Sequence, residues 1–167
     1  MFLVPMLNTC TGESTEQTST ADTATIDVRF LDSAPDIFIL ENNSSCDLGE
    51  SFFFVDFSNS AGDLYFDTDP SDGSWMSSQF AAAHGDLELV DGPILDGDQS
   101  LIVHMAELGA GEQAIFTIDV DGANDYQVSS AQIDGGVVGL VTVGDDAHYR
   151  TAFEDSTAAS LSVNCNK

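Results

Sequence analysis

The sequence predicts an all-β protein, a single antiparallel β-sandwich of the immunoglobulin-like type with about nine or ten strands. Three observations predict this fold. Apolar and polar residues alternate with a period of two in several short segments. Turn-forming residues such as Asp-Gly and Asn-Asn separate these segments at short intervals. Hydrophobic residues make up 43% of the 167 residues, which is enough for the core of one domain of ordinary size.

The alternation assigns the strands in chain order. Segments 25–30, 101–105, 113–121 and 160–165 each direct one set of apolar side chains to a core and the polar set to solvent. Segments 37–40 and 52–57 are apolar on both faces, which predicts central strands covered on both sides. Further strands are expected at 63–67, 87–91, 137–143 and 147–153. Segment 77–84, with three successive alanines, predicts a helical turn.

The N-terminal region differs from the rest of the chain. Residues 1–9 are apolar and resemble part of a signal or lipoprotein leader, and residues 10–23 form a Ser/Thr-rich stretch typical of a flexible tether. The folded domain is therefore expected at 24–167. Leu7 to Cys10 resembles a lipoprotein cleavage box, which makes Cys10 a candidate for lipidation; a cleaved ordinary signal and a misplaced start are the alternatives. We expect a location outside the cell or in its envelope.

Two cysteines lie within the expected domain, Cys46 and Cys165. In an exported protein two such cysteines usually pair, and the alternation in 160–165 points Cys165 inward. The disulfide would close a loop of more than about 100 residues and contribute about 4–5 kcal/mol in the loop-entropy model. The alternative is two buried thiols in a reducing compartment.

The charge balance is extreme, with 29 acidic residues against 3 basic ones and a net charge of −26. It excludes a phosphate-backbone binder and therefore a nucleic-acid partner. It also opposes binding to anionic membranes, apart from a lipid anchor. Repulsion at this charge destabilises a compact chain, and either a salty medium or bound cations would relieve it.

Bound Ca²⁺ is the more specific explanation, because Ca²⁺ prefers carboxylate, amide and carbonyl oxygens on turning loops. Two loops that follow expected strands offer such oxygens. The candidate ligands are Asp67, Asp69 and Asp72 in the first loop, and Asp119, Asp121, Asn124 and Asp125 in the second. Weaker candidates are Asp96 with Asp98 and Asp145 with Asp146. The alternative is that these are only turn residues.

No complete catalytic motif is present in the sequence, so a non-enzymatic protein is expected. His84, His104 and His148 lack the His-Glu-x-x-His spacing of zinc enzymes, and no Gly-x-Ser-x-Gly motif occurs. Trp75 and Tyr65 are candidates for stacking on a sugar ring. The alternative is that Trp75 covers one end of the core.

Five segments together resemble a family of small exported bacterial proteins, mostly marine, known as "aggregation factor core" proteins. These segments are 27–36 (DVRFLDSAPD), 42–49 (NNSSCDLG), 56–67 (DFSNSAGDLYFD), 96–101 (DGDQSL) and 108–121 (LGAGEQAIFTIDVD). The resemblance implies an exported β-sandwich with cation-dependent adhesion and no catalytic residues. We therefore expect a surface protein for adhesion or aggregation, whose partners are itself or other cell-surface proteins or glycans. A carbohydrate-binding module and a passive component of a cell-envelope assembly are the alternatives.

Overall fold

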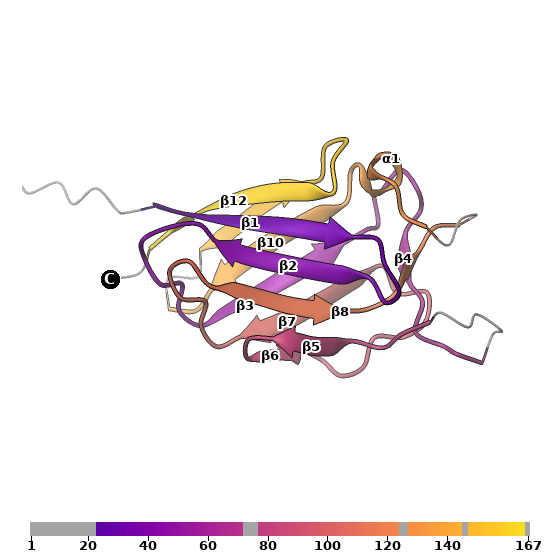
Figure 1. The fold of residues 1–167 in the computed structure, drawn as a ribbon, viewed down its shortest axis with the longest axis horizontal. Helices are drawn as coiled ribbons and strands as arrows, with labels where there is room; N and C mark the ends of the chain where they lie inside the picture. The colour runs from indigo at the N-terminus through magenta and orange to yellow at the C-terminus, as the bar shows by residue number, and fades with distance from the viewer. Residues whose placement is uncertain (1–22, 72–76, 124–126, 145–146, 166–167) are drawn as a thin grey trace, which may run out of the picture.

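The structure, a computed structural model, describes residues 23–71, 77–123, 127–144 and 147–165. Two five-stranded antiparallel sheets pack face to face (Figure 1), so the predicted all-β sandwich is confirmed. The first sheet has the order β12 (Ala158–Asn164), β1 (Thr23–Leu31), β2 (Ile37–Asn42), β8 (Gln113–Thr117) and β5 (Ala81–His84). The second has the order β11 (His148–Ala152), β10 (Val137–Thr142), β3 (Ser51–Asp56), β7 (Ser100–Met105) and β6 (Leu87–Leu89).

Two shorter elements complete the fold. A two-stranded ribbon joins β4 (Tyr65–Phe66) to β9 (Val120–Asp121), and a single helical turn, α1, spans Ser130–Ile133. In the described part of the chain this makes twelve strands, two or three more than the sequence predicts. The α1 turn begins after Ser129, whose backbone N–H donates to the Gln132 side chain at 2.9 Å. The polar spacing of Ser129 and Gln132 is a known helix-start signal.

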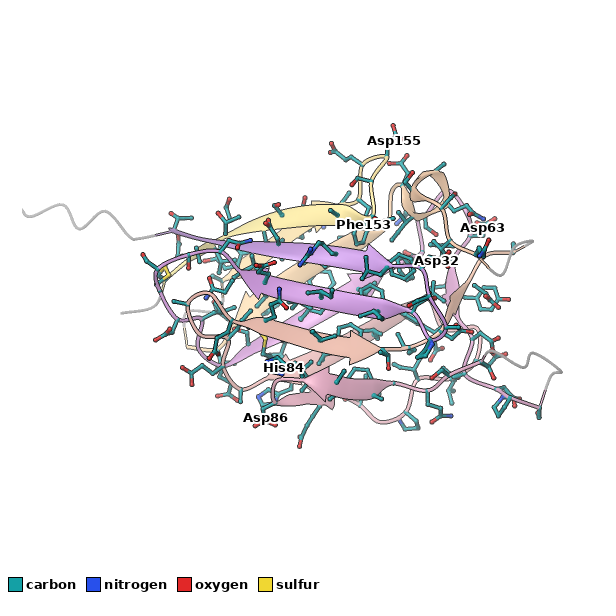
Figure 2. All side chains as sticks on the ribbon, in the orientation of Figure 1. Asp32, Asp63, His84, Asp86, Phe153 and Asp155 are labelled. Carbon is teal, nitrogen blue, oxygen red and sulfur yellow. A yellow bond between two sulfur atoms is a disulfide. The ribbon has the colours of Figure 1, made fainter. Side chains whose placement is uncertain are left out.

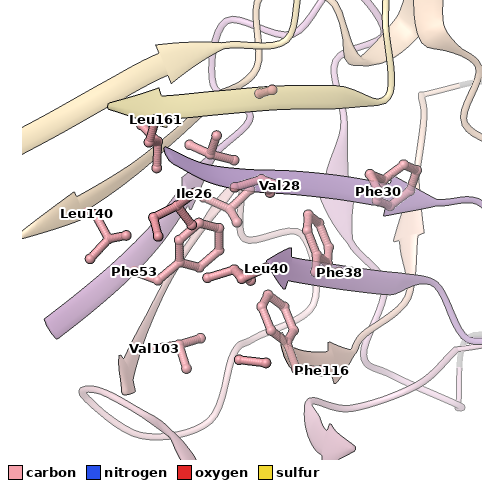
Figure 3. Packing of buried hydrophobic residues seen from close by; sticks show 14 of the residues in the cluster. Ile26, Val28, Phe30, Phe38, Leu40, Phe53, Val103, Phe116, Leu140 and Leu161 are labelled. Carbon is pink, nitrogen blue, oxygen red and sulfur yellow. The ribbon is translucent and has the colours of Figure 1, made fainter. Parts of the chain in front are cut away.

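The core lies between the two sheets and follows the predicted alternation. Ile26, Val28 and Phe30 of β1 are buried, as are the inward-facing residues of β7, β8 and β12. Figure 3 shows Phe38 of β2 packed between Phe30 and Phe116, with ring centroids 5.2 and 4.9 Å away. Burial of such aromatic side chains contributes much of the stability of a sandwich of this size.

The two doubly apolar segments are central, as predicted, because β2 and β3 are each the middle strand of a sheet. The prediction that both of their faces are covered is wrong. Phe52 and Phe54 of β3 and Ile37 and Ile39 of β2 are only partly buried on the outer faces. The sandwich has two layers, so the outer face of a central strand meets solvent even where its residues are apolar.

The segment at 77–84 corrects the expectation of a helical turn. Ala81–His84 forms strand β5, which pairs with β8 at the edge of the first sheet with an irregular register. Alanine favours helix only as a weak intrinsic preference, and the unpaired hydrogen-bonding edge of β8 outweighs it.

Cys46 and Cys165 form the predicted disulfide, with their Cα atoms 6.1 Å apart. It joins the connection that follows β2 to the residue that follows β12. A disulfide of this kind indicates an oxidising, extracellular compartment. Among the described residues, no helix is long and apolar enough to cross a membrane.

Candidate metal centre

The pairing of β4 with β9 places three carboxylates on the same side of one ribbon. Tyr65 lies opposite Asp121 and Phe66 lies opposite Val120, so Asp67 lies opposite Asp119. The backbone N–H of Asp67 donates to the carbonyl of Asp119 at 3.1 Å, which extends the pairing by one residue. Opposite residues of an antiparallel pair share a face, as do residues two apart on one strand. The three aspartates therefore project together.

Their carboxylate oxygens are close enough to hold one ion. Asp67, Asp119 and Asp121 each offer an oxygen, and these oxygens all lie within 4.8 Å of one another. Ca²⁺ binds oxygens at about 2.3–2.6 Å, so two ligands on opposite sides of the ion are about 5 Å apart. All three residues are buried: the exposed fractions of Asp67, Asp119 and Asp121 are 2%, 5% and 5%. The group can therefore hold a metal ion, and its ligand atoms are all oxygens.

A fourth aspartate fixes β9 in position. Asp36 lies in the connection from β1 to β2 and is 1% exposed. Its carboxylate accepts hydrogen bonds from the backbone N–H groups of Ser33 and Val120, each at 2.8 Å. Its own carbonyl accepts the N–H of Ile118 at 3.1 Å. Ile118 lies opposite Asp36 when the β2–β8 register is continued by one residue, so the carbonyl bond extends that pairing, and the Asp36 carboxylate holds Val120 beyond it. The predicted strand at 113–121 is divided into β8 and β9.

The electrostatic environment of this group is strongly negative. Burial raises the pKa of Asp36 to about 7, and the neighbouring Asp119 and Asp32 raise it as well, against the lowering effect of its two backbone hydrogen bonds. Burial likewise raises the pKa of Asp119 to about 7, with further contributions from Asp121, Asp67 and Asp32. In both residues the charged form is disfavoured because water is excluded and like charges are near.

Two basic side chains of the described residues form ion pairs outside this group. Arg29 on β1 binds Glu41 at 2.9 Å, and His104 on β7 contacts Glu50 at 3.0 Å. Arg150 lies on β11, the edge strand of the other sheet. Three buried carboxylates this close together form a group that a bound cation would stabilise.

The structure changes how the predicted ligands are grouped. Asp67 from the first predicted loop joins Asp119 and Asp121 from the second, so residues expected in two separate sites form one group. Asp69 does not join it. Asp69 is exposed, accepts a hydrogen bond from the N–H of Ser71 at 2.8 Å, and has its pKa lowered by Ser71. Asp72, Asn124 and Asp125 lie outside the described residues.

The weaker candidates have structural roles where the chain is described. Asp98 accepts the N–H of Leu95 at 2.8 Å, and Asp96 lies 3.4 Å from the N–H of Thr68, so both brace the connection between β6 and β7. Tyr65 is half-buried on β4 beside the three aspartates. Cys10, Trp75, Asp145 and Asp146 lie outside the described residues.

The three histidines belong to different places in the fold. His84 ends β5 in the first sheet and, like Asp86, lies at the edge of the sandwich in Figure 2. His104 and His148 lie on β7 and β11 of the second sheet. Within the described residues, none of them is part of the group of three carboxylates.

Asp36 and Asp32 are the residues near this site that the sequence did not identify. Asp32 is exposed and accepts the N–H of Val128 at 3.2 Å (Figure 2 shows it at the same end of the sandwich). The signal in the sequence that could have pointed to Asp36 is the Ser33-Ala-Pro-Asp36 turn, which has a proline shortly after the expected strand at 25–30. Nothing in the sequence connects that turn to residues 118–120.

The fold and the site define a class: an acidic, disulfide-bonded β-sandwich with a buried group of three aspartates at one end. No family model and no curated protein matches this sequence.

Proposed function

We propose that the protein acts on the outside of the cell as a non-enzymatic, cation-dependent adhesion or aggregation protein, and that Ca²⁺ binds between Asp67, Asp119 and Asp121. The observation that carries this proposal is the burial of three carboxylates on one side of the β4–β9 ribbon, with oxygens within 4.8 Å. A lipid on Cys10 would hold the domain at the cell surface.

The chemistry of the ligands favours Ca²⁺ over other metals. The group contains neither His nor Cys, so it suits a hard cation rather than zinc or copper. Ca²⁺ accepts six to eight oxygens in flexible geometry, whereas Mg²⁺ demands a near-octahedral set and keeps several waters. Three carboxylates from two chain segments, with backbone carbonyls and water completing the shell, fit the larger ion better.

Ca²⁺ would affect both the local structure and the surface. The ion would replace repulsion between Asp67 and the β9 aspartates by attraction, and so fix two segments that are about fifty residues apart in sequence. It would also lower the negative potential at this end of the sandwich. Two molecules that each have a formal net charge of −26 repel each other, and they can approach only when cations reduce this repulsion.

The two other expected functions stay predictions. A carbohydrate-binding module would need exposed aromatic side chains, and of the two candidates only Tyr65 lies among the described residues, where it is half-buried. A passive component of a cell-envelope assembly would not require the group of three buried aspartates.

The experiment is a bead-clumping assay with the full chain attached to beads. Millimolar Ca²⁺ should cause clumping that NaCl of equal ionic strength does not cause. Asp119→Asn should abolish the Ca²⁺ effect, because it removes one of the three carboxylates. Asp69→Asn is the matched control: it removes the same charge from the exposed loop next to Asp67 and should leave clumping unchanged.

Clumping that is identical in Ca²⁺ and NaCl would leave screening as the whole effect and would refute the proposal. Equal behaviour of Asp119→Asn and Asp69→Asn would show that the buried group is not the site.

A further inference from the structure

The outer face of the second sheet carries two rows of side chains that run across all five strands. Strand register defines them. The first row is His148, Val141, Phe52, His104 and Glu88, from β11 to β6. The second row is Arg150, Gly139, Phe54, Ile102 and Val90, where Val90 follows β6 and donates its N–H to the carbonyl of Ile102 at 2.9 Å. We call these ten residues the β3 face.

The centre of the β3 face is apolar. Ile102 is 41% exposed, and Phe52 and Phe54 are half-buried beside it. The ring of Phe54 lies over Gly139, where an added Cβ would come within 2.3 Å of the ring. Adjacent apolar residues on three strands form a continuous patch, which in a soluble protein marks an interaction surface more often than scattered residues do.

Charge is divided between the two edges of the β3 face. Arg150 and His148 lie on β11 at one edge, and Glu88 lies on β6 at the other, followed by Asp91. Within the described residues Arg150 makes no ion pair. On a chain with only three basic residues, this edge is one of the few places able to attract an acidic surface.

A pocket opens at the acidic edge. It has a volume of about 210 Å³, and its lining includes Val90, Pro93 and Ile102, with Asp91 and Ser100 beside them. The lining combines apolar side chains with the carboxylates of Asp91 and Asp98, which suits a side chain that has an aliphatic stem and a cationic end. Arginine is such a side chain.

We propose that the β3 face binds the β3 face of a second copy of this chain. The two copies are related by a two-fold axis that lies between the two faces and is approximately parallel to β3. This operation exchanges the two edges of the sheet. Arg150 of each copy then lies over the pocket of the other, with its guanidinium beside Asp91, and His148 lies opposite Glu88. Phe52 and Phe54 of the two copies meet at the axis.

The partner is a second copy because the β3 face complements itself. A two-fold axis along the strands places cationic edge over acidic edge twice, whereas an axis across the strands would place like charges together. Facing sheets pack with their strands rotated by about 30°, and the long arginine stem can accommodate the resulting offset. Five strands spaced about 4.8 Å apart make a small interface, so the dimer is weak.

Salt should strengthen this dimer. The two copies repel through their net charges, and raising NaCl from about 0.1 M to about 1 M shortens the Debye length from about 10 Å to about 3 Å. The inference rests on the proposed function only for its biological meaning, since a self-binding face would supply the contact between adhering surfaces. The face does not include the three aspartates, so dimerisation is expected with a chelator present.

The test is sedimentation equilibrium of the full chain with chelator, at low and at high NaCl. A monomer–dimer equilibrium that tightens with salt is expected. Ile102→Glu should weaken it at least tenfold, because it places a charge in the apolar centre. Leu31→Glu is the matched control on β1 of the other sheet: Leu31 is 43% exposed, and its substitution should change nothing.

A second pair of variants tests the orientation. Arg150→Glu should weaken the dimer at least tenfold and Asp91→Asn several-fold, whereas Arg29→Glu on β1 should have no effect. Melting temperatures verify that each variant is folded. A monomer under all conditions, or equal effects of Ile102→Glu and Leu31→Glu, would overturn the inference and leave Ca²⁺ binding unaffected. A chain that dimerises but does not bind Ca²⁺ would instead overturn only the proposed function.

Discussion

Three buried aspartates side by side impose an energetic cost on the folded protein. Like charges directly opposite each other on paired strands are destabilising, and Asp67 and Asp119 occupy such positions. A chain that only needed a hydrated acidic surface would keep these carboxylates exposed, as it does Asp69. Carboxyl groups with pKa values raised by burial and by like charges are typical of functional sites, where a ligand compensates the cost.

The raised pKa values predict how stability depends on pH without divalent cations. The pKa values of Asp36 and Asp119 are about 7 in the folded chain, against 3.8 for an unperturbed carboxyl group. Their protonated forms therefore favour folding. This contribution is complete below about pH 4 and is lost as the pH rises to about 7. Each pKa unit corresponds to about 1.4 kcal/mol, so two groups raised from 3.8 to about 7 give an upper bound of about 9 kcal/mol. Solvent screening around Asp119 and coupling between the two carboxyl groups reduce this bound, so we expect a loss on the order of a few kcal/mol.

Denaturant unfolding in chelator between pH 4 and pH 8 checks this prediction. Asp119→Asn should flatten the decline, since it removes one of the two titrating groups, and Asp69→Asn should not. Saturating Ca²⁺ should also flatten it by stabilising the charged carboxylates. Identical pH profiles for the native chain and Asp119→Asn would contradict the account.

The elements show what the sequence could predict. Period-two alternation identified β1, β7, β8 and β12, because one buried face dictates which residues of a strand are apolar. It misassigned Ala81–His84, whose alanines carry no alternation and whose strand depends on pairing with β8. The site was predicted in part. Asp67, Asp119 and Asp121 were among the candidate ligands, but their grouping depends on the pairing of β4 with β9, which the alternation within each segment does not predict.

Strand β10 offers a test of packing on the outer face. Gly139→Ala would place a Cβ 2.3 Å from the ring of Phe54 and 2.5 Å from the carbonyl oxygen of Tyr149. We expect a loss of about 1–3 kcal/mol in the free energy of unfolding, the usual cost of overpacking. Gly49→Ala is the control, since no atom lies within 4 Å of the added Cβ. Equal stabilities of the two variants, measured by denaturant unfolding, would contradict this packing.

At the scale of the whole molecule, the disulfide and the group of three aspartates lie at opposite ends of the sandwich. Strand β12 ends at Asn164, one residue before the disulfide, whereas β4 and the aspartates that follow it lie at the other end (Figure 1). The core between them joins the two ends into one body. Repulsion between the 29 acidic residues favours expansion of that body, which the disulfide opposes and a cation bound at the aspartates would also oppose.

Removal of the disulfide should destabilise the protein without removing the metal site. Cys46→Ser with Cys165→Ser frees a loop whose ends are 119 residues apart, and the loop-entropy model gives a loss of about 4–5 kcal/mol. Thermal unfolding with and without Ca²⁺ measures both effects. The melting temperature should fall while its increase on adding Ca²⁺ persists. Loss of that increase in a folded variant would mean that the two ends are not independent.

Isothermal titration calorimetry of the full chain with Ca²⁺ tests the central claim most directly. The account predicts a single class of Ca²⁺ site that is lost in Asp119→Asn and retained in Asp69→Asn. It also predicts a rise in melting temperature that exceeds the rise in NaCl of equal ionic strength. Binding that survives Asp119→Asn unchanged, or equal stabilisation by the two salts, would contradict it.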